Sequence, residues 1–387
     1  ITPDVIHAWL MSNLTDATVL SFLKNVRLIV VDEIHNYSGV FGSNSAMLFR
    51  RLRHVLTMQR ASYRFLLASA TIADPLKHVR NLFGIDCAVV GSDADGSPKH
   101  AVDVRLITPP ETTDLLTGVS KLLSHLAKPP GERFIAFVDS RKQTEQLASI
   151  LGRPQEEEVP PADQEGELDL KDLETLAILP YRSGYEEADR IKIQRALAAG
   201  TLRGVVSTSA LELGLDIQGL EAAVLVGVPR SATSFVQRIG RIGRHGPGRV
   251  YVVNTGSLLD REVFSNPDSL LTRPLEDSAL YLANPRIQYI HALCLARLGG
   301  EHDQVAARSG QKAETEFASG VEWPDGFLQL CTSERAGTIP GDLQSMKAES
   351  GDDPNHSFPL RDVEGQFRVE MRRGPDVRSF GSLSHSQ

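Results

Sequence analysis

The sequence predicts an α/β protein with two parallel-sheet regions, followed by a mostly helical region. Three observations support this prediction. Apolar, strand-like runs alternate with helix-like segments from Leu28 to Val253, which is the pattern of parallel strands joined by helices. A turn-rich stretch at 91–100, GSDADGSPKH, divides this alternation into two parts. After Asn254 the segments become shorter and the alternation stops.

In the first region, the apolar run Leu28–Val31 predicts a strand buried on both faces, because continuous apolar runs are typical of parallel sheets. In the second region, a proline-containing acidic insertion at 153–174 interrupts the alternation. The first region is expected to continue with helices at 44–60 and 75–83 and strands at 64–70 and 87–90. The second is expected to have strands at 102–107, 134–138, 177–181, 204–209, 222–227 and 249–253, with helices at 113–126, 140–151 and 186–199.

We expect four domains along the chain. The two α/β domains would occupy 1–98 and 99–255, and a helical accessory region would occupy 256–344, with a helix at 287–298. A winged helix is one alternative for that region, but any packed helix has the same periodicity. Residues 345–387, rich in Gly, Ser, Asp and Pro, are expected to form a small, partly disordered tail with one strand-like piece at 365–371.

Composition excludes several classes of protein. The formal net charge of -8 argues against a protein that coats nucleic acid through bulk charge, although Arg230–Arg249 is locally basic. The cysteines Cys87, Cys294 and Cys331 lack metal-ligand spacing, which indicates neither zinc nor a disulfide framework. No apolar run is long enough to span a membrane. We therefore expect a cytoplasmic, reducing environment and no membrane partner.

Asp32 and Glu33 directly follow the first apolar strand. In open α/β sheets the carboxyl ends of the strands line the ligand crevice. One carboxylate there can hold hydrated Mg²⁺ while its neighbour orients an attacking water. The alternative is that the pair only solvates a strand end.

Ser69, Ala70 and Thr71 follow the next strand, so that their hydroxyls would emerge near Asp32. We expect the hydroxyls to hydrogen-bond the acidic pair and His35, connecting nucleotide state to domain movement. The plain alternative is a helix start, with Thr71 or Asp74 as the cap.

Two stretches of the second region are candidates for phosphate binding. Residues 205–217 run from a strand into a small-residue turn, where amides and hydroxyls suit phosphate oxygens and Asp216 suits a ribose or a partner arginine. An N-capped helix ended by Gly214 is the alternative. Gln237, Arg241 and Arg244 would lie on one face of a helix, where two guanidiniums suit a transferring γ-phosphate.

Arg50, Arg51 and Arg53 lie on the helix expected at 44–60. We expect them to form a solvated helix face rather than a direct nucleic-acid contact.

These motifs, in this order, resemble the helicase core of superfamily-two ATPases over Ile1–Val253. Residues 32–35, DEIH, look like motif II of that family. Motifs III, IV, V and VI correspond to 69–71, 137–145, 207–217 and 237–244. The string from Asp32 to Arg53 is similar to the MrfA-like DNA repair helicases, although their closing four-cysteine metal site has no counterpart here.

The resemblance implies an ATP-dependent helicase or translocase that unwinds DNA in the 3′ to 5′ direction and serves genome maintenance. It also implies two RecA-like domains, ATP and Mg²⁺ as cofactors, and single-stranded nucleic acid as partner, DNA rather than RNA. Asp32 would hold Mg²⁺, Glu33 would be the catalytic base and His35 would couple hydrolysis to the nucleic acid. Gln237 would position the γ-phosphate, with Arg241 and Arg244 as arginine fingers. Gly214 and Asp216 would contact the nucleotide. The residues that would contact the phosphodiester backbone of the nucleic acid are Thr2, Pro3, Asp4, Ser140, Arg141, Ser183, Gly184 and Thr208.

No G-x-x-x-x-G-K-[ST] loop occurs among the 387 residues. Because Thr2–Asp4 resembles motif Ib, which follows that loop, we expect an amino-terminal truncation with an incomplete first sheet and negligible hydrolysis by the chain alone. Two alternatives stay open: a non-hydrolysing nucleic-acid-binding or scaffold protein derived from a helicase, and a duplex translocase of an antiviral or restriction system.

Overall fold

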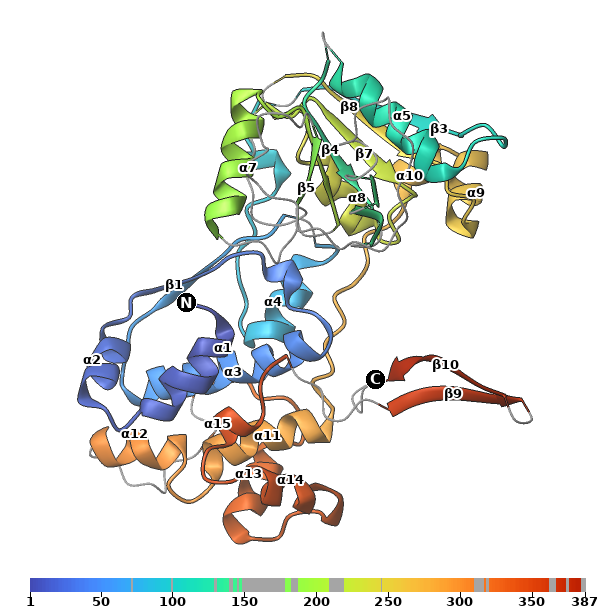
Figure 1. The fold of residues 1–387 in the computed structure, drawn as a ribbon. Helices are drawn as coiled ribbons and strands as arrows, with labels where there is room; N and C mark the ends of the chain where they lie inside the picture. The colour runs from blue at the N-terminus through green and yellow to red at the C-terminus, as the bar shows by residue number, and fades with distance from the viewer. Residues whose placement is uncertain are drawn as a thin grey trace. The chain divides into compact units, whose positions relative to one another are not determined.

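The chain forms two compact units in a computed structural model (Figure 1). Unit 1 consists of Ile1–Val90 and Asp277–Gln387, and unit 2 is Gly91–Glu276. The structure describes residues 1–70, 72–98, 100–128, 131–138, 142–144, 146–147, 178–181, 187–208, 219–244, 246–309, 317, 320–361, 367–373 and 376–383. The acidic insertion at 153–174 lies outside the described residues.

Unit 2 contains a six-stranded sheet in the order β3-β8-β7-β4-β6-β5, and every paired neighbour is parallel. The parallel α/β class predicted from the sequence is thereby confirmed. The strands are β3 (Val102–Ile107), β4 (Phe134–Phe137), β5 (Ile178–Tyr181), β6 (Gly204–Ser207), β7 (Ala222–Val226) and β8 (Gly248–Val253).

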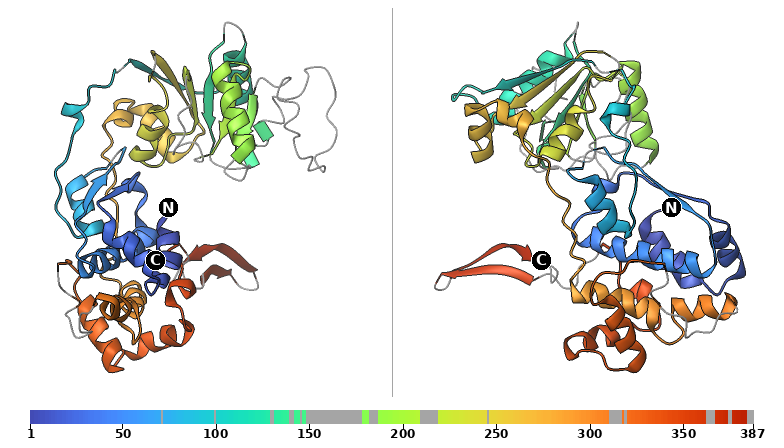
Figure 2. Two further views of the ribbon diagram at one scale, coloured as in Figure 1. Left: turned by 90° about the vertical axis from the view of Figure 1, so that its left-hand side faces the viewer. Right: turned by 180° about the vertical axis from the view of Figure 1, so that it is seen from behind.

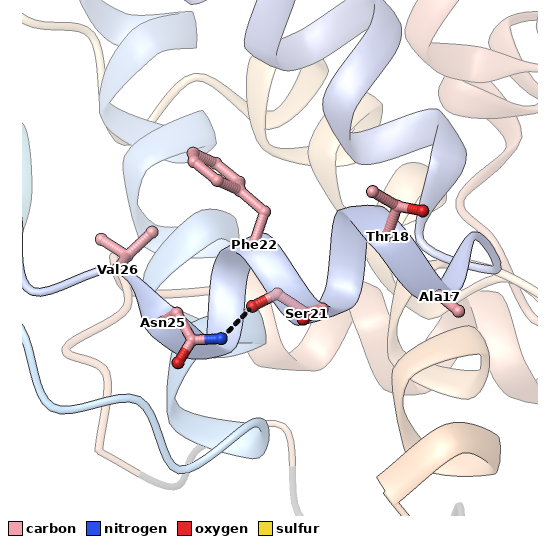
Figure 3. A pocket seen from close by; sticks show the side chains of 6 residues that line it. All are labelled: Ala17, Thr18, Ser21, Phe22, Asn25 and Val26. Carbon is pink, nitrogen blue, oxygen red and sulfur yellow. Dashed lines mark hydrogen bonds between the residues drawn. The ribbon is translucent and has the colours of Figure 1, made fainter.

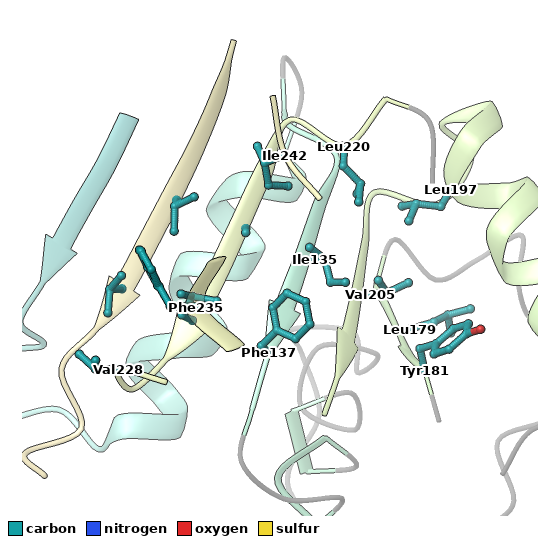
Figure 4. Packing of buried hydrophobic residues seen from close by; sticks show 14 of the residues in the cluster. Ile135, Phe137, Leu179, Tyr181, Leu197, Val205, Leu220, Val228, Phe235 and Ile242 are labelled. Carbon is teal, nitrogen blue, oxygen red and sulfur yellow. The ribbon is translucent and has the colours of Figure 1, made fainter. Parts of the chain in front are cut away.

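Helices cover both faces of this sheet, which explains why its strands are continuous apolar runs. On β4, Ile135 and Phe137 face one cluster of buried side chains, drawn in Figure 4, while Phe134 and Ala136 face another. α5 (Leu115–Ala127) packs on the Phe134 face. The Ile135 face is covered by α7 (Glu187–Ala199), α8 (Ala232–Ile239), α9 (Leu258–Ser265) and α10 (Asp268–Thr272).

The strands of unit 1 correct one expectation. β1 (Leu28–Val31) pairs with β2 (Arg64–Leu67) in parallel, as a two-stranded sheet. The prediction that this run is buried on both faces is wrong, since Leu28 and Val30 are 55% and 58% exposed. The physical reason is that Leu28 and Val30 point to one face of the two-stranded sheet, as successive side chains alternate between faces, and this face is left uncovered by the described residues.

The long helix α3 (Gly39–Met58) contributes side chains to three buried clusters of unit 1 and is drawn in blue in Figure 2. One side of α3 packs with α4 (Pro75–Phe83) beneath β1. Other sides pack with the segments η1 (Ile6–Leu10) and η2 (Met11–Asn13), with α2 (Ala17–Asn25), and with later helices. Those helices are α11 (Pro285–Ala296), α12 (Glu301–Ser309) and α13 (Phe327–Ala336), while α14 (Gln344–Glu349) and α15 (Pro354–Ser357) pack with α11.

The arginines of α3 are buried, so the expectation of a solvated face is wrong: Arg50, Arg51 and Arg53 are 3%, 0% and 9% exposed. Arg50 donates to the carbonyls of Asn81 and Leu82, and Arg53 to those of Phe83 and Gly84. These carbonyls end α4 and lack partners within it. Arg50 and Arg53 therefore cap α4, while Arg51 pairs with Glu301.

Other differences concern the ends of the two expected regions. The strand expected at 87–90 is absent from the structure of these residues. The helix expected at 287–298 is α11, which begins at Pro285, where Asn284 caps it. In the stretch expected to be a tail, Met346 and Phe358 join a buried cluster, and β9 (Phe367–Arg373) pairs antiparallel with β10 (Asp376–Leu383).

Across the part of the chain that the structure describes, none of the helices combines the length and apolarity that crossing a membrane requires.

Candidate active site and nucleic-acid interface

Asp32 and Glu33 lie at the carboxyl end of β1, where the backbone turns sharply. Glu33 has φ 52° and ψ 44°, a left-handed conformation that non-glycine residues adopt at a cost. The Glu33 amide donates to Oδ1 of Asp32 at 2.8 Å. The short 3₁₀ segment η3 (Ile34–Asn36) follows, and its first turn closes with the Asn36 amide on the Glu33 carbonyl at 2.9 Å.

Two contacts from outside the loop hold this strained turn. The Ile34 amide donates to the Ala68 carbonyl at 3.0 Å, which ties the loop to the end of β2. On the other side, Nε2 of His78, a buried residue of α4, lies 2.9 Å from the Ile34 carbonyl oxygen. A carbonyl oxygen only accepts, so Nε2 of His78 carries the proton. The loop is thus fixed from both neighbouring elements.

His35 connects Glu33 to Ser69. Its Nδ1 lies 3.2 Å from Ser69 Oγ and 3.4 Å from Glu33 Oε2. Because the carboxylate only accepts, the contact with Glu33 favours a proton on Nδ1 of His35. Burial lowers the pKa of His35 below its usual value, and the Glu33 and Asp32 carboxylates act in the opposite direction. His35 is therefore held neutral beside the acidic pair.

The acidic pair fits a hydrated magnesium ion. Mg²⁺ commonly binds through one or two carboxylates and retains several waters. Asp32 is exposed, and one of its oxygens is engaged by the Glu33 amide. The described residues contain no cluster of three or more His, Cys, Asp or Glu side chains suited to a metal. A site completed by water and phosphate oxygens is consistent with that, whereas a cage of protein ligands is not.

Unit 2 carries Gln237, Arg241 and Arg244. The expectation that all three share a helix face is wrong, since α8 ends at Ile239 and Gly240 is its C-cap. Gly243, with φ 78°, continues the turn. A Cβ at Gly243 would lie 2.8 Å from a methyl group of Val102, so close packing requires glycine there. Gln237 lies on α8, and the two arginines follow it in the turn.

The turn after α8 is packed against the sheet. Ile242 is 4% exposed and belongs to the cluster around Phe137. Nε of Arg244 donates to the Gly240 carbonyl at 3.0 Å. Arg238, which lies between Gln237 and Gly240, is buried, and its guanidinium lies 5.0 Å from the centre of the Phe137 ring. These contacts anchor the segment that carries Arg241 and Arg244.

The residues expected to contact nucleic acid are only partly described. Thr2 caps the short helix α1 (Pro3–Val5), and Asp4 accepts a hydrogen bond from Nε of Arg361 at 3.1 Å. Thr208 is half-buried directly after β6. The remaining residues assigned to coupling, nucleotide or nucleic-acid contact lie outside the described residues: Thr71, Ser140, Arg141, Ser183, Gly184, Gly214 and Asp216.

A separate pocket of about 590 Å³ opens along α2 (Figure 3). Its lining residues contain no titratable side chain, and Nδ2 of Asn25 is engaged by the Ser21 carbonyl at 2.8 Å. This pocket therefore offers little chemistry. It is lined by Ala17, Thr18, Ser21, Phe22, Asn25 and Val26.

Sequence reasoning missed two residues that hold the candidate site. His78 supports the Asp32–Glu33 loop from 44 positions away, and Glu276 supports the start of α8 from the same separation. Neither belongs to a motif, and long-range partners of single polar residues leave no periodic signal in one sequence. The sequence signal for His78 is weak: it is a histidine among the apolar positions of the helix expected at 75–83.

Comparison with known proteins identifies two family models in the chain. Residues 1–79 match the DEAD/DEAH box helicase family, and residues 117–246 match the helicase conserved C-terminal domain. The ATP-dependent helicase hrq1 of Schizosaccharomyces pombe is 32% identical over 305 residues, covering 76% of this chain and 27% of that protein. The uncharacterized ATP-dependent helicase YprA of Bacillus subtilis is 32% identical over 301 residues, covering 76% of this chain and 38% of that protein.

Solved structures show the same relationship. The crystal structure of the DUF1998 helicase MrfA bound to DNA is 26% identical, with a TM-score of 0.71, and covers 99% of this chain and 48% of that one. The fold is also shared with the Mycobacterium smegmatis helicase Lhr bound to ssDNA and AMP-PNP, at a TM-score of 0.55 and 19% identity, over 81% of this chain and 39% of that one. The chain spans about half or less of the length of each of these relatives. It belongs to the superfamily-two DEAD/DEAH-box helicases and is similar to the MrfA group within them.

Proposed function

We propose that this chain is the motor core of an ATP-dependent helicase that unwinds DNA in the 3′ to 5′ direction and serves genome maintenance. The observation that carries the proposal is the geometry at the end of β1. A left-handed Glu33 is held by backbone and His78 contacts, with His35 between its carboxylate and Ser69. Strain of this kind persists where a fixed side-chain direction is needed.

Each residue of this loop has a separate task in the proposal. Asp32 holds Mg²⁺, which neutralises charge on the phosphate oxygens when it is bound. Glu33 accepts the proton of the attacking water, as a positioned carboxylate does in general base catalysis. The His35–Ser69 contact links the carboxylate to the end of β2 and so transmits the nucleotide state.

Unit 2 contributes positive charge to the same reaction in this proposal. Arg241 and Arg244 stabilise charge that develops on the transferring phosphate, and Gln237 positions it. The Phe137, Ile242 and Gly243 packing described above keeps the turn that bears them rigid.

The choice of DNA is supported by a solved relative, and the 3′ to 5′ polarity is what the resemblance to the MrfA-like helicases implies. The solved MrfA structure contains DNA, and this chain shares its fold over nearly its whole length. Grip on the strand would be sequence-independent, through phosphate contacts made by Thr2–Asp4 and Thr208 together with Ser140, Arg141, Ser183 and Gly184.

The test is strand displacement by the full-length gene product on duplexes with a 3′ or a 5′ single-stranded tail, in DNA and in RNA. We expect ATP-dependent displacement from the 3′-tailed DNA only. Displacement from the 5′-tailed duplex would overturn the polarity, and displacement from RNA alone would overturn the substrate. ATP hydrolysis without displacement would favour the duplex translocase. Nucleic-acid binding without hydrolysis would favour the binding or scaffold protein.

A further inference from the structure

The start of α8 is held by a residue far along the chain. The Ala232 amide donates to Oε1 of Glu276 at 2.7 Å, and the Thr233 amide donates to Oε2 at 3.3 Å. The Thr233 hydroxyl donates to the same oxygen at 3.1 Å. A carboxylate at the first turn of a helix satisfies amides that have no partner within the helix and opposes the positive end of its dipole. Glu276 therefore acts as a second cap, beside the local cap Ser231.

The electrostatics of Glu276 agree with this contact. Burial acts to raise its pKa, but the hydrogen bonds from the Ala232, Glu276 and Thr233 amides and the Thr233 hydroxyl prevail, so the pKa lies below its ordinary value. Glu276 is thus ionised at neutral pH, when its charge stabilises the helix start.

A second contact braces the loop that precedes α8. Nη2 of Arg273 donates to the Pro229 carbonyl at 2.9 Å. Residues 273–276 thereby hold the loop at Pro229 and the first turn of α8 together. Gln237 lies on this short helix, and Arg241 and Arg244 follow its end. A shift of the first turn would therefore displace all three residues.

The chain enters unit 1 directly after Glu276, and it is anchored there as well. The Gly39 amide donates to the Ala279 carbonyl at 2.7 Å, and the Tyr281 amide donates to Ser43 Oγ at 2.7 Å. Both contacts fasten the chain to the first turns of α3. Nζ of Lys77 also reaches Oδ2 of Asp277 at 3.0 Å, but this pair is exposed and adds little.

We propose that Glu276 is a positioning residue for Gln237, Arg241 and Arg244, because it holds the first turn of the helix that bears Gln237 and precedes the two arginines. This inference rests on the proposed function, because it assigns those three residues to the nucleotide.

The first arm of the test does not depend on activity. Hydrogen–deuterium exchange is followed by mass spectrometry in the Ala232–Ile239 segment of the wild type, Glu276→Ala, Glu276→Gln and Asp277→Asn. We expect Glu276→Ala to speed exchange of the Ala232 and Thr233 amides at least tenfold and Glu276→Gln to speed it less, since the amide keeps one acceptor oxygen. Asp277→Asn, the matched control, should leave exchange unchanged. Unchanged exchange in Glu276→Ala would overturn the proposal.

The second arm measures DNA-stimulated ATP hydrolysis by the full-length gene product with the same substitutions. We expect Glu276→Ala to lower kcat about tenfold with KM within about twofold, because positioning acts on the reacting state rather than on binding. Faster exchange with unchanged kcat would reduce Glu276 to a purely structural cap and overturn the proposal. A wild type without hydrolysis would instead refute the proposed function, and the exchange arm would tell the two failures apart.

Discussion

At the scale of single residues, the catalytic loop depends on a backbone conformation that Glu33 does not favour. Left-handed φ and ψ angles at a non-glycine residue cost on the order of 1–3 kcal/mol. The contacts of Ile34 with Ala68 and His78 offset this cost. Nδ1 of His78 has no hydrogen-bond partner among the described residues, and its burial lowers the pKa of the ring. A neutral ring with its proton on Nε2 fits both observations.

We predict that His78→Leu lowers the kcat of ATP hydrolysis about fivefold, because the Ile34 carbonyl loses its donor and Glu33 loses its fixed direction; one hydrogen bond is worth about 1 kcal/mol. His78→Gln is the control, since its amide N–H can donate to the same carbonyl. Steady-state kinetics of the full-length gene product with both substitutions measures this. If the leucine and glutamine variants were equally impaired, volume rather than hydrogen bonding would explain the role of His78.

At the scale of elements, a buried hydrogen-bond network joins the helices of unit 1. Arg51 of α3 uses all five of its N–H groups. Nε donates to Glu301 Oε2 at 2.8 Å, and Nη2 donates to Glu301 Oε1 and to Asn355 Oδ1. Nη1 faces Nδ1 of His7 at 3.3 Å and Nδ1 of His291 at 2.8 Å. Both rings must accept there, so both are neutral with the proton on Nε2.

Each Nε2 of these histidines then has an acceptor. That of His7 lies 3.0 Å from the Phe358 carbonyl, and that of His291 lies 3.2 Å from Asn44 Oδ1. Protonation at Nδ1 would aim a second positive charge at Arg51. Burial and the Arg51 charge accordingly lower the pKa of His7 to about 3 and that of His291 well below its usual value.

This network predicts how stability depends on pH. The native pKa values of His7 and His291 lie below the unfolded value of about 6.5. Above pH 6.5 both rings are neutral in both states, so neither changes stability. Below pH 6.5 the unfolded state binds the protons first, and the free energy of unfolding falls by at most about 1.4 kcal/mol per pH unit for each histidine.

Urea unfolding of the chain between pH 7 and pH 4.5 measures this slope, with His7→Gln as the comparison. Glutamine keeps an acceptor and a donor but does not titrate, so we expect a shallower loss of stability below pH 6.5 in the variant. Parallel slopes in wild type and variant would show that His7 titrates normally in the native state.

Some features of the elements could be predicted from the sequence and others could not. Patterns of apolar residues located β1, β3, α4 and α7 to within a residue or two, because burial and local capping determine those bounds. Burial itself could not be predicted for Arg50, Arg51 and Arg53, because their partners include carbonyls and a carboxylate that the fold brings from 30 to 272 residues away. The break of α8 before Arg241 depends on Gly240 as the C-cap and on Gly243, which packs against Val102 of β3; a helical wheel represents neither.

At the scale of the whole molecule, the helices α11 to α15 belong to the same compact unit as the Asp32–Glu33 loop. Met47 of α3 packs with Ile287 and Phe327, and Leu48 with Val305. The first α/β region and the later helices thus share one core, although they are separated by the whole of unit 2. The alternation of strands and helices predicted the two parallel sheets. It could not predict that residues 277–361 pack in the same compact unit as the first α/β region.

The most direct test of the account compares ATP hydrolysis by the full-length gene product and by its Glu33→Gln variant, with and without single-stranded DNA. We predict that single-stranded DNA stimulates the wild type. Glu33→Gln should hydrolyse ATP at least a hundredfold more slowly, because it loses the general base, while it still binds nucleotide. Equal rates in the two proteins would contradict the role of Glu33 at the end of β1 and with it the central claim.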